Sequence, residues 1–510
     1  MLAWTIYISF LGALLARLSP SKGLARAVAL LTALAGLGIG LVTLHAWQPG
    51  ELLTITRIAW VPQLGLEYYL AADGISLTLV LLTGLAATAG ILFSWNIEMR
   101  TQEFFAFYLV LIGGVYGVFL SFDLFLLFVF YEIAIIPKYF LIAIWGSAKA
   151  GATGEEAGSQ REYAAMKLAL YSFGGSALVL AGMVATWVAA GAHSMSFDVL
   201  AAAHLSTPLQ MALFPLVFVG FAVLAGMWPF HTWAPTGHAA APTAASMLLA
   251  GVVMKLGAYG CLRVAMMLFP AGMGPWGFHV LGLGSWREVF ALLAVIGIVY
   301  GASVALVQRD FKFVIGYSSV SHMGFVLLGL MTLTQIGLDG AVLQMFSHGV
   351  IAGLLFAVVG RMAYDRTHTR DLNELGPMQL GHAIPFAAVT FILAGMASIG
   401  LPGFSGFIAE FQILVGTWQS FSWMIVIAGI GILVGIAFTW RALTKAFYGE
   451  PTPGAVEHAL PPITFPEKLG ALLLLASTLV VGLYPRILID LILPALNSPL
   501  FEGLRQGAWR

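Results

Sequence analysis

A few ionisable side chains lie deep inside long apolar stretches of this sequence. Glu132, Lys255 and Glu410 are each surrounded mainly by hydrophobic residues, and His322 and His348 occupy similar depths in two successive stretches. A charge at the centre of a bilayer costs about 2.5 to 3.5 kcal/mol on insertion scales, so each group should be paired, neutral or in contact with water. Carboxylates, amines and imidazoles change charge with their surroundings, which is what a proton relay requires. These five residues are therefore our candidates for proton transfer.

The composition indicates that these residues lie in helices that cross a membrane. The chain has 510 residues, of which 60% are hydrophobic and 9% charged, and its mean hydropathy is +0.94. Soluble globular domains do not have such a composition. Apolar runs of roughly 17 to 25 residues are long enough to cross a bilayer as helices, and about fourteen follow one another along the chain. We predict an all-α integral membrane protein that forms a single transmembrane domain over residues 1–510.

The loops between the apolar runs differ in charge. The predicted spans cover residues 1–16, 27–47, 74–95, 104–122, 124–146, 165–190, 210–228, 242–268, 289–307, 313–331, 340–362, 383–420, 422–444 and 469–493. Lys and Arg gather in alternate loops, at residues 17–26, 100, 149–167, 309, 361–370 and 441–468. By the positive-inside rule these loops face the cytoplasm, so both termini are predicted on the external side.

Several kinds of chemistry are excluded. Cys261 is the only cysteine, so the chain can form neither an intramolecular disulfide nor a cluster of thiolate ligands, and we expect this residue to be a small packing group. Net charge is zero and no basic tract is present, which excludes nucleic acid as a partner. The longest polar loops, 147–163 and 449–468, are too short for a soluble catalytic domain. The chemistry is expected inside the lipid bilayer.

Two predicted helices are interrupted. In residues 225–260 the apolar run breaks at Pro229 and Pro235, and the break holds His231 and His238. In the second half, glycines and a proline interrupt the run just before Glu410. Broken helices survive at membrane depth only where protein or a hydrated cavity satisfies the freed backbone groups, and transporters bind their ions there. The pair of breaks indicates a structural repeat around ion sites.

Other buried charges have competing explanations. Lys138 follows Glu132 by six residues and could extend its amine to the membrane surface, and Lys312 lies at the inner end of its helix. We expect Arg263 to extend outward in the same way. Glu132 could form a structural ion pair, and either histidine could be a packing residue. Two histidines at matching depth between lysines and glutamates favour a relay.

Seven motifs together carry a family resemblance. They are AADGISLTLVLLT (71–83), FYEIAIIPKYFLIAIWG (130–146), the stretch from Trp228 to Ala244 containing WPFHTWAP and APTA, YSSVSHMGFVL (317–327), FSHG (346–349), THTRDLNELG (367–376) and LPGFSGFIAEF (401–411). With them the chain resembles, over almost its full length, the antiporter-like membrane subunits of respiratory complex I.

The resemblance implies a fold and a function. It implies fourteen helices with two inverted five-helix repeats, at 104–268 and 289–448, in which helices 7 and 12 are broken; residues 1–95 and 469–510 would be flanking helices. It implies proton pumping in a bacterial inner membrane, driven by quinone reduction in other subunits. This chain would carry no cofactor, and NADH, FMN, iron–sulfur clusters and quinone would bind partner subunits. Neighbouring antiporter-like subunits would be among those partners.

The resemblance also assigns roles to individual residues, and at two positions this sequence differs from the family pattern. Glu132 would be the carboxylate of the fifth helix, Lys255 the central lysine, His322 and His348 the bridging relays, and Glu410 the terminal carboxylate. The family's lysine in the first half of helix 7 is replaced by Leu224, and its aspartate after the proline by Thr236. We hypothesise that Lys138 supplies the missing charge beside Glu132, helped by a kink at Pro137.

These assignments suggest a path. Protons would enter near His231, His238 or Lys312, pass Lys255, then travel through His322 and His348 to Glu410. Three other functions stay open: a subunit of a Mrp-type cation/proton antiporter or of a membrane-bound hydrogenase, a scaffold subunit that does not pump, and a solute transporter that works alone.

Overall fold

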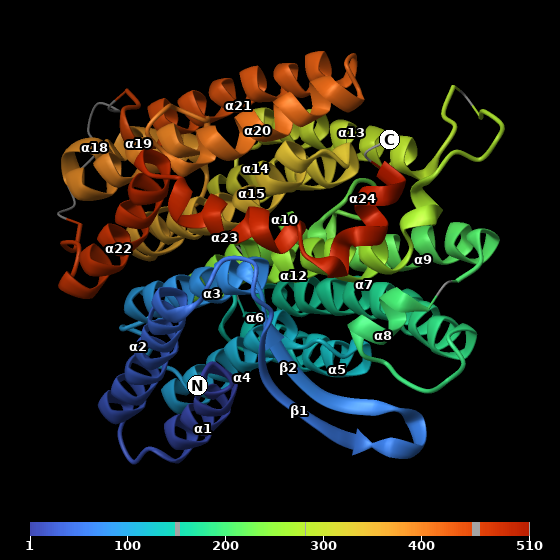
Figure 1. Ribbon diagram of the computed structural model, residues 1–510. Helices are drawn as coiled ribbons and strands as arrows, with labels where there is room; N and C mark the ends of the chain where they lie inside the picture. Colours follow the sequence, from blue (N-terminus) through green and yellow to red (C-terminus); the bar gives the residue numbers. More distant parts are fainter. Residues whose placement is uncertain (148–153, 204, 281, 451–459, 509–510) are drawn as a thin grey trace.

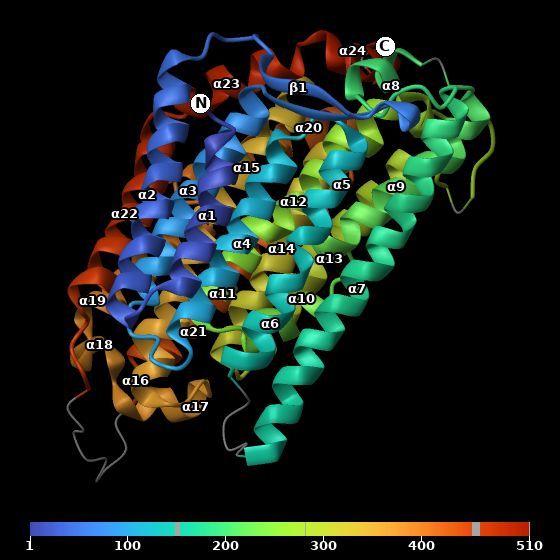
Figure 2. The same ribbon diagram turned by 90° about the horizontal axis from the view of Figure 1, so that it is seen from below.

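The computed structural model describes residues 1–147, 154–203, 205–280, 282–450 and 460–508. Long helices run side by side through the molecule, with α1 and α2 at one edge, α21 at the opposite edge, and α12, α14 and α15 between them (Figure 1). Both chain ends lie at the same end of this bundle (Figure 2). The prediction of a mostly helical membrane protein is confirmed.

Twelve helical segments in the described residues are long and apolar enough to cross a bilayer. They are α2 (Lys22–Ala46), α3 (Gly74–Phe93), α4 (Thr101–Leu120), α5 with α6 (Leu124–Ile133, Ile135–Trp145), α7 (Gly154–Ala189), α9 (Thr207–Ala225), the run Thr243–Met266 that contains α11 (Thr243–Leu248) and α12 (Met254–Gly260), α13 (Trp286–Val307), α14 (Phe311–Thr332), α15 (Gln335–Phe356) with its extension to Thr367, α21 (Met424–Phe447) and α22 (Phe465–Leu483). The apolar helices α1 (Trp4–Leu18) and α19 (Pro385–Ser398) are shorter. The figure of about fourteen spans stays a prediction, as do the repeats and their boundaries.

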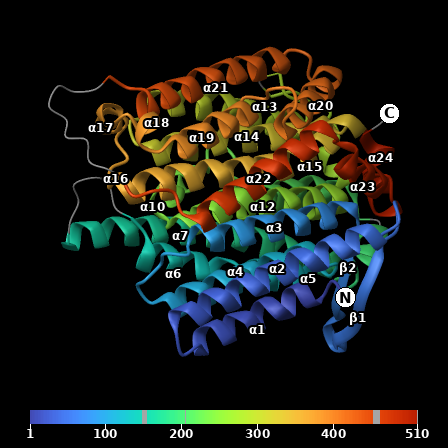
Figure 3. The ribbon, with the colours of Figure 1, turned by 90° about the vertical axis from the view of Figure 1, so that its left-hand side faces the viewer.

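The two ends of the bundle differ, and we name them after their contents. The terminal face carries both termini, α8 (Phe197–Ala202), α23 (Arg486–Leu496) and α24 (Glu502–Ala508), whereas the loop face carries α16 (Asp365–Thr367), α17 (Leu372–Leu375) and α18 (Leu380–Ala383) (Figures 2 and 3). The basic loops within the described residues lie at the loop face, as the charge pattern predicts; Lys149 lies outside the described residues.

Two features of the terminal face differ from the sequence prediction. The segment 48–73 was expected as a loop, but it forms an antiparallel hairpin of β1 (Leu53–Val61) and β2 (Leu66–Ala72). The last span was expected to continue to residue 493. It ends at Leu483 instead, because Pro485 cannot continue the helix, and α23 packs as a separate helix on α3 and α15. The backbone of Leu491 lies so close to Gly74 that a Cβ there would be 1.8 Å from its carbonyl oxygen.

Three helices are interrupted near candidate residues. The fifth span breaks at Ala134, where Pro137 would clash with the carbonyl of Ile133. The chain turns at Gly226 (φ +81°) after α9 and resumes in α10 (Trp233–Ala240). The third break separates α19 from α20 (Ser405–Ser420) at Gly400 and Gly403, which have φ values of +72° and +102° that favour glycine. Both predicted interruptions are present, but the break expected at Pro235 is not: this proline lies in the first turn of α10, where its missing N–H costs no helical hydrogen bond, and the helix ends at Ala240 instead. His238 therefore lies in this short helix.

Candidate functional site

Lys255 and His348 are in direct contact at the centre of the bundle. The Lys255 Nζ lies 2.8 Å from His348 Nδ1 and also donates a hydrogen bond to the Ala250 carbonyl. Ala250 belongs to a π-helical turn, Leu249–Val253, of the kind that occurs often at functional sites. Both side chains are buried, with 0% and 3% exposure. An ammonium at Lys255 therefore has an imidazole acceptor within direct reach.

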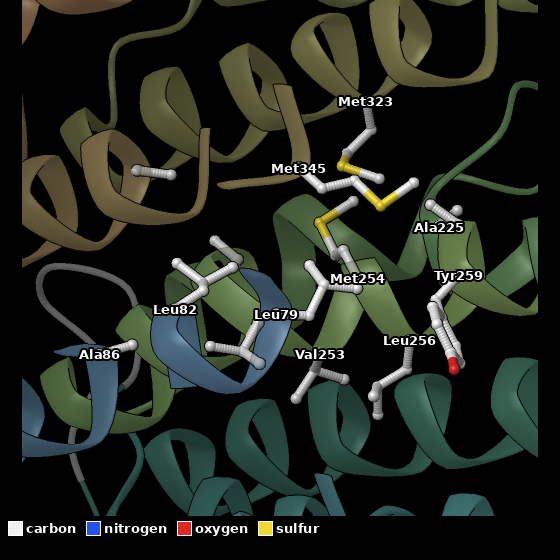
Figure 4. Packing of buried hydrophobic residues seen from close by; sticks show 14 of the residues in the cluster. Leu79, Leu82, Ala86, Ala225, Val253, Met254, Leu256, Tyr259, Met323 and Met345 are labelled. Atoms are coloured by element: carbon white, nitrogen blue, oxygen red, sulfur yellow. The ribbon is translucent and has the colours of Figure 1, made fainter. Parts of the chain in front are cut away.

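Apolar side chains pack around the residue that precedes the lysine. Met254 converges with Met323 of α14 and Met345 of α15 (Figure 4). Leu79 and Leu82 of α3 pack beside the same helix (Figure 4). Within the described residues, the hydrogen-bond partners of the Lys255 amine are the Ala250 carbonyl and His348.

His322 continues the row from His348 to Glu410. The two imidazole rings stack with centroids 5.4 Å apart and an interplanar angle of 30°. His322 Nδ1 is 3.1 Å from Glu410 Oε1, and His322 Nε2 is 3.1 Å from the Ser398 hydroxyl. The amide of Gln344 donates to the same Glu410 oxygen at 3.3 Å. We call Lys255, His348, His322 and Glu410 the relay.

The structure corrects the order of the two histidines. The sequence prediction placed His322 next to Lys255, followed by His348. In the structure His348 of α15 touches Lys255, and His322 of α14 touches Glu410. The reason is the helix arrangement: α15 packs against the π-helical turn beside Lys255, whereas both α14 and α15 pack against α20, which carries Glu410. Positions along the chain could not reveal this.

Glu132 and Lys138 form no direct ion pair. No contact of 4 Å or less joins their charged atoms among the described residues, although each lies within electrostatic range of the other. Lys138 is 1% exposed, and neither its Nζ nor Glu132 Oε1 has a hydrogen-bond partner among the residues that the structure describes. The Ser176 hydroxyl of α7 faces Glu132, and Ser172 is one turn away. We call these four residues the Glu132 cluster, and the partnership of Lys138 with Glu132 stays a hypothesis.

The backbone of Leu224 lies close to the helix that carries Lys255. The Leu224 side chain is buried in the core, with 1% exposure. The helix of Lys255 approaches it at Gly257, where a Cβ would be 2.5 Å from Ala225 N and 3.0 Å from Leu224 C. Only a glycine allows two helices to pack this closely. At the position of the family's lysine, this chain therefore has a buried apolar side chain whose backbone packs against the helix of Lys255.

His231 and His238 are buried but lie apart from the hydrogen-bonded row. His231 packs against Tyr300 with ring centroids 5.0 Å apart, and His238 packs 5.3 Å from Phe356. None of their ring nitrogens has a hydrogen-bond partner among the described residues. His238 lies within electrostatic range of Lys255 and His348, so it is the nearer of the two to the relay.

Lys312 stabilises the end of α10. Its amine donates to the Ala241 carbonyl at 3.0 Å and lies 5.5 Å from the ring centroid of Tyr364. Arg370 donates to the Ala239 carbonyl at 2.6 Å and pairs with Asp310 at 3.1 Å. Cations at the carboxyl end of a helix satisfy its free carbonyls and its dipole. The structure thus gives Lys312 a structural contact at the loop face and no contact with the relay.

Arg263 does not extend to the surface as expected. It is fully buried and pairs with Asp73 at 2.6 Å, while the rings of Phe122, Tyr259 and Phe501 surround its guanidinium. Asp73 begins α3 and accepts the Ser76 amide with its other oxygen. Because these rings keep Arg263 away from solvent, the guanidinium pairs with the neighbouring carboxylate of Asp73 and does not extend to the surface.

Asp339 is one of the buried carboxylates that the sequence analysis did not identify. Asp339 falls just outside the predicted span 340–362, but α15 begins at Gln335 and buries this residue to 1% exposure. The helix starts earlier because Thr334 accepts the Gly337 amide as an N-terminal cap. That capping threonine is the sequence signal that could have moved the boundary.

The arrangement defines a class of protein. Titratable groups aligned across a helical membrane bundle can move protons, and no group of three or more histidine, cysteine or acidic residues in the described parts of the chain could hold a metal ion. The molecule is a membrane protein of the ion-translocating type.

Comparisons with known proteins identify the family. A family profile described as "NADH:quinone oxidoreductase/Mrp antiporter, TM" matches residues 121–436. NADH-quinone oxidoreductase subunit M of Rhodobacter capsulatus is 38% identical over 451 residues, which cover 86% of this chain and 82% of the relative. The subunit M of Escherichia coli (strain K12) is 34% identical over 508 residues, 96% of each chain. The chain belongs to the family of membrane subunits of NADH:quinone oxidoreductases and Mrp antiporters, as an antiporter-like subunit of the respiratory complex I type.

Solved structures agree with this assignment. A chain of respiratory complex I from Thermus thermophilus with bound NADH matches all of this chain and all of its own length, with a TM-score of 0.86 and 25% identity. A chain of the Mrp complex from Dietzia sp. DQ12-45-1b has a TM-score of 0.83 over 100% of this chain and 99% of that one, but 20% identity. The second likeness shows the fold alone.

Proposed function

We propose that this chain translocates protons as a membrane subunit of a respiratory NADH:quinone oxidoreductase. The observation that carries the proposal is the relay, in which Lys255, His348, His322 and Glu410 follow one another across the core with direct or stacking contacts. The names of the curated relatives supply the enzyme complex.

The chemistry of the relay is a series of proton exchanges. The Lys255 ammonium donates toward His348 Nδ1, and a proton taken up there makes that ring an imidazolium. Passing a proton across the stacked rings would charge His322, which Glu410 stabilises as a carboxylate. Two unit charges 4 Å apart interact by about 4 kcal/mol at an effective dielectric constant of 20, equivalent to about three pKa units. A charge change at a neighbouring site is therefore large enough to load or empty each group.

The finer assignments are part of this proposal. The termini and the hairpin would face the external side, and protons would enter from the loop face near Lys312, His231 or His238. The chain would bind no redox cofactor itself, since NADH, FMN, iron–sulfur clusters and quinone would belong to partner subunits. Glu132, half-buried at mid-span, would respond to the state of an adjoining antiporter-like subunit.

The alternatives have less support. A role in a Mrp antiporter or a membrane-bound hydrogenase is compatible with the family, but the relatives named above, at 34 to 38% identity, are NADH-quinone oxidoreductase subunits. A scaffold that does not pump would have no need for four titratable groups in contact. A solute transporter working alone is not the kind of protein these relatives are named for.

The test is Glu410→Gln in inside-out membrane vesicles. Glutamine keeps the size and the hydrogen bond to His322 but cannot take up a proton. We expect the rate of NADH-driven acidification to fall about a hundredfold, which is the lower end of the effect that one proton-transfer group usually has. NADH oxidation by an artificial acceptor, together with His382→Gln on the exposed helix α18, controls for assembly. Normal acidification in Glu410→Gln would contradict proton translocation by this relay.

A further inference from the structure

Asp339 of α15 is a buried carboxylate with no assigned partner. It is 1% exposed, and neither of its side-chain oxygens has a hydrogen-bond partner among the described residues. Burying a carboxylate that has no partner costs free energy, because the group loses its hydration and gains no hydrogen bond or ion pair in exchange. The relay does not include it, and within the described parts of the chain no Lys, Arg or His nitrogen lies within 4 Å of it.

The position of Asp339 relates it to the end of the relay. The next residue, Gly340, packs on α20 so closely that a Cβ would be 2.8 Å from Gln412 Cβ and 3.0 Å from the Ala409 carbonyl oxygen. Ala409 directly precedes Glu410, so Asp339 lies within about one helical turn of the last relay group, on the side of the terminal face. Close packing of α15 on α20 brings the two carboxylates to neighbouring levels.

Other unpartnered polar atoms lie between them. The side-chain carbonyl oxygens of Gln344 and Gln412 are buried and have no hydrogen-bond partner in the described protein. Gln344 donates its amide to Glu410, and the side chain of Gln412 faces Asp339. Buried polar atoms of this kind are normally satisfied by ordered water. The two amides therefore line a polar connection through an otherwise apolar helix contact.

The connection continues to the surface. Asp339 lies within electrostatic range of Asp490, which is exposed on α23 at the terminal face. The helix α23 packs directly on α15. A carboxylate on the surface attracts cations, including protons, and raises their local concentration.

We propose that Asp339 is the outlet group through which protons leave Glu410 for the terminal face beside Asp490. The inference rests on the proposed function. In the step, the Glu410 carboxyl group gives up its proton and becomes a carboxylate, and water between the Gln344 and Gln412 amides carries that proton to the Asp339 carboxylate, which becomes a carboxylic acid. Asp339 then loses the proton to the solvent at Asp490 and returns to the carboxylate. No electron moves, and the net charge is conserved at each transfer.

The experiment uses the whole complex in inside-out vesicles. Asp339→Asn removes the titrating group at constant size, Asp339→Ser removes it with less volume in case the first variant fails to assemble, and Asp339→Glu restores it. Asp371→Asn at the loop face is the matched control, because asparagine can still accept the Asn373 amide that Asp371 caps. The acidification rate is divided by the rate of NADH oxidation with an artificial acceptor, so that a smaller amount of assembled complex does not affect the result.

The expected result is a normalised acidification about tenfold lower in Asp339→Asn and Asp339→Ser, and retained in Asp339→Glu and Asp371→Asn. Normal acidification in either non-titrating variant overturns the outlet role, and so does an equal loss in Asp339→Glu, which would indicate packing. Glu410→Gln is measured in parallel. If that variant pumps normally, the proposed function itself fails; if it does not, the result for Asp339 concerns the outlet alone.

Discussion

The relay and the Glu132 cluster contain similar residue types but differ in how those residues meet. In the relay, Lys255 touches His348, and His322 touches Glu410, at 2.8 and 3.1 Å. In the Glu132 cluster, the lysine amine, a carboxylate oxygen and two serine hydroxyls are buried without hydrogen-bond partners. The relay is thus a row of titratable groups in contact, which is the geometry that the proposed proton transfer requires, whereas the charged groups of the cluster interact only at a distance.

The difference follows from the helices that carry the groups. Three helices, α14, α15 and α20, meet at the relay. A close approach at Gly340 joins α15 to α20, and one at Gly349 joins α15 to Gly251 of the π-helical turn before Lys255. Glu132 and Lys138 lie on either side of the break at Ala134 in a single span, and Leu224 supplies no polar group nearby. An isolated charge pair in a medium of low dielectric constant couples over a longer range than one in water. We infer that the cluster senses charge and the relay conducts it.

The largest expected effect breaks the relay. His348→Phe keeps an aromatic ring beside His322 but removes the acceptor of Lys255, so normalised acidification in vesicles should fall about a hundredfold. His382→Phe on the exposed helix α18 is the matched control. Retained pumping in His348→Phe would mean that protons bypass the connected row, and the contrast between the two regions would disappear.

A smaller effect is expected in the Glu132 cluster. Glu132→Gln should lower acidification about tenfold while NADH oxidation by an artificial acceptor stays intact, because a sensor adjusts the relay without lying in its path. Unchanged pumping would make Glu132 a structural residue.

The partnership of the two cluster charges can be tested by a double-mutant cycle. If Lys138 replaces the family's lysine, the losses of pumping caused by Glu132→Gln and by Lys138→Met should not be additive in the double mutant. Converted from the pumping rates, the coupling free energy should be about 0.5 to 3 kcal/mol. Tyr163→Phe, at an exposed position of α7 outside the cluster, serves as the control substitution. Additive losses would leave Lys138 independent of Glu132.

The smallest effect concerns the start of the helix that carries Glu132. Asp123 caps α5 and accepts the amides of Leu126 and Glu67, and burial raises the pKa of its carboxyl from 3.8 to about 6. Because this pKa is higher in the folded state than in the unfolded one, the stabilising contribution is complete below pH 3.8 and is lost as the pH rises through about 6.

Hydrogen exchange at these two amides is the measurement. After correction for intrinsic exchange, the protection of the Leu126 and Glu67 amides should fall between pH 4 and 6. The expected decrease in the opening free energy is about 1 kcal/mol or less. Asp123→Asn can still accept both amides and should show no such dependence. A dependence that persists in Asp123→Asn would have to come from another group.

Sequence and tertiary structure contributed different parts of this picture. Hydrophobic runs and proline and glycine positions are local properties, which is why the helical membrane fold, the breaks before His231 and Glu410, and the buried titratable residues could be predicted. The hairpin was missed because its short strands have no strong hydrophobic pattern, and the burial of Asp339 was missed because the helix boundary depends on the Thr334 cap.

What only the tertiary structure decided is which of these groups touch. Lys255 and His348 are 93 residues apart in the chain, and His322 and Glu410 are 88 apart, so their contacts depend on helix packing and not on spacing. The same packing reversed the expected order of the histidines, paired Arg263 with Asp73, and left Lys138 without a direct partner. Residue types determine which protons can be held, but the distances between helices determine where those protons can go, because proton transfer and ion pairing require contact within a few ångströms.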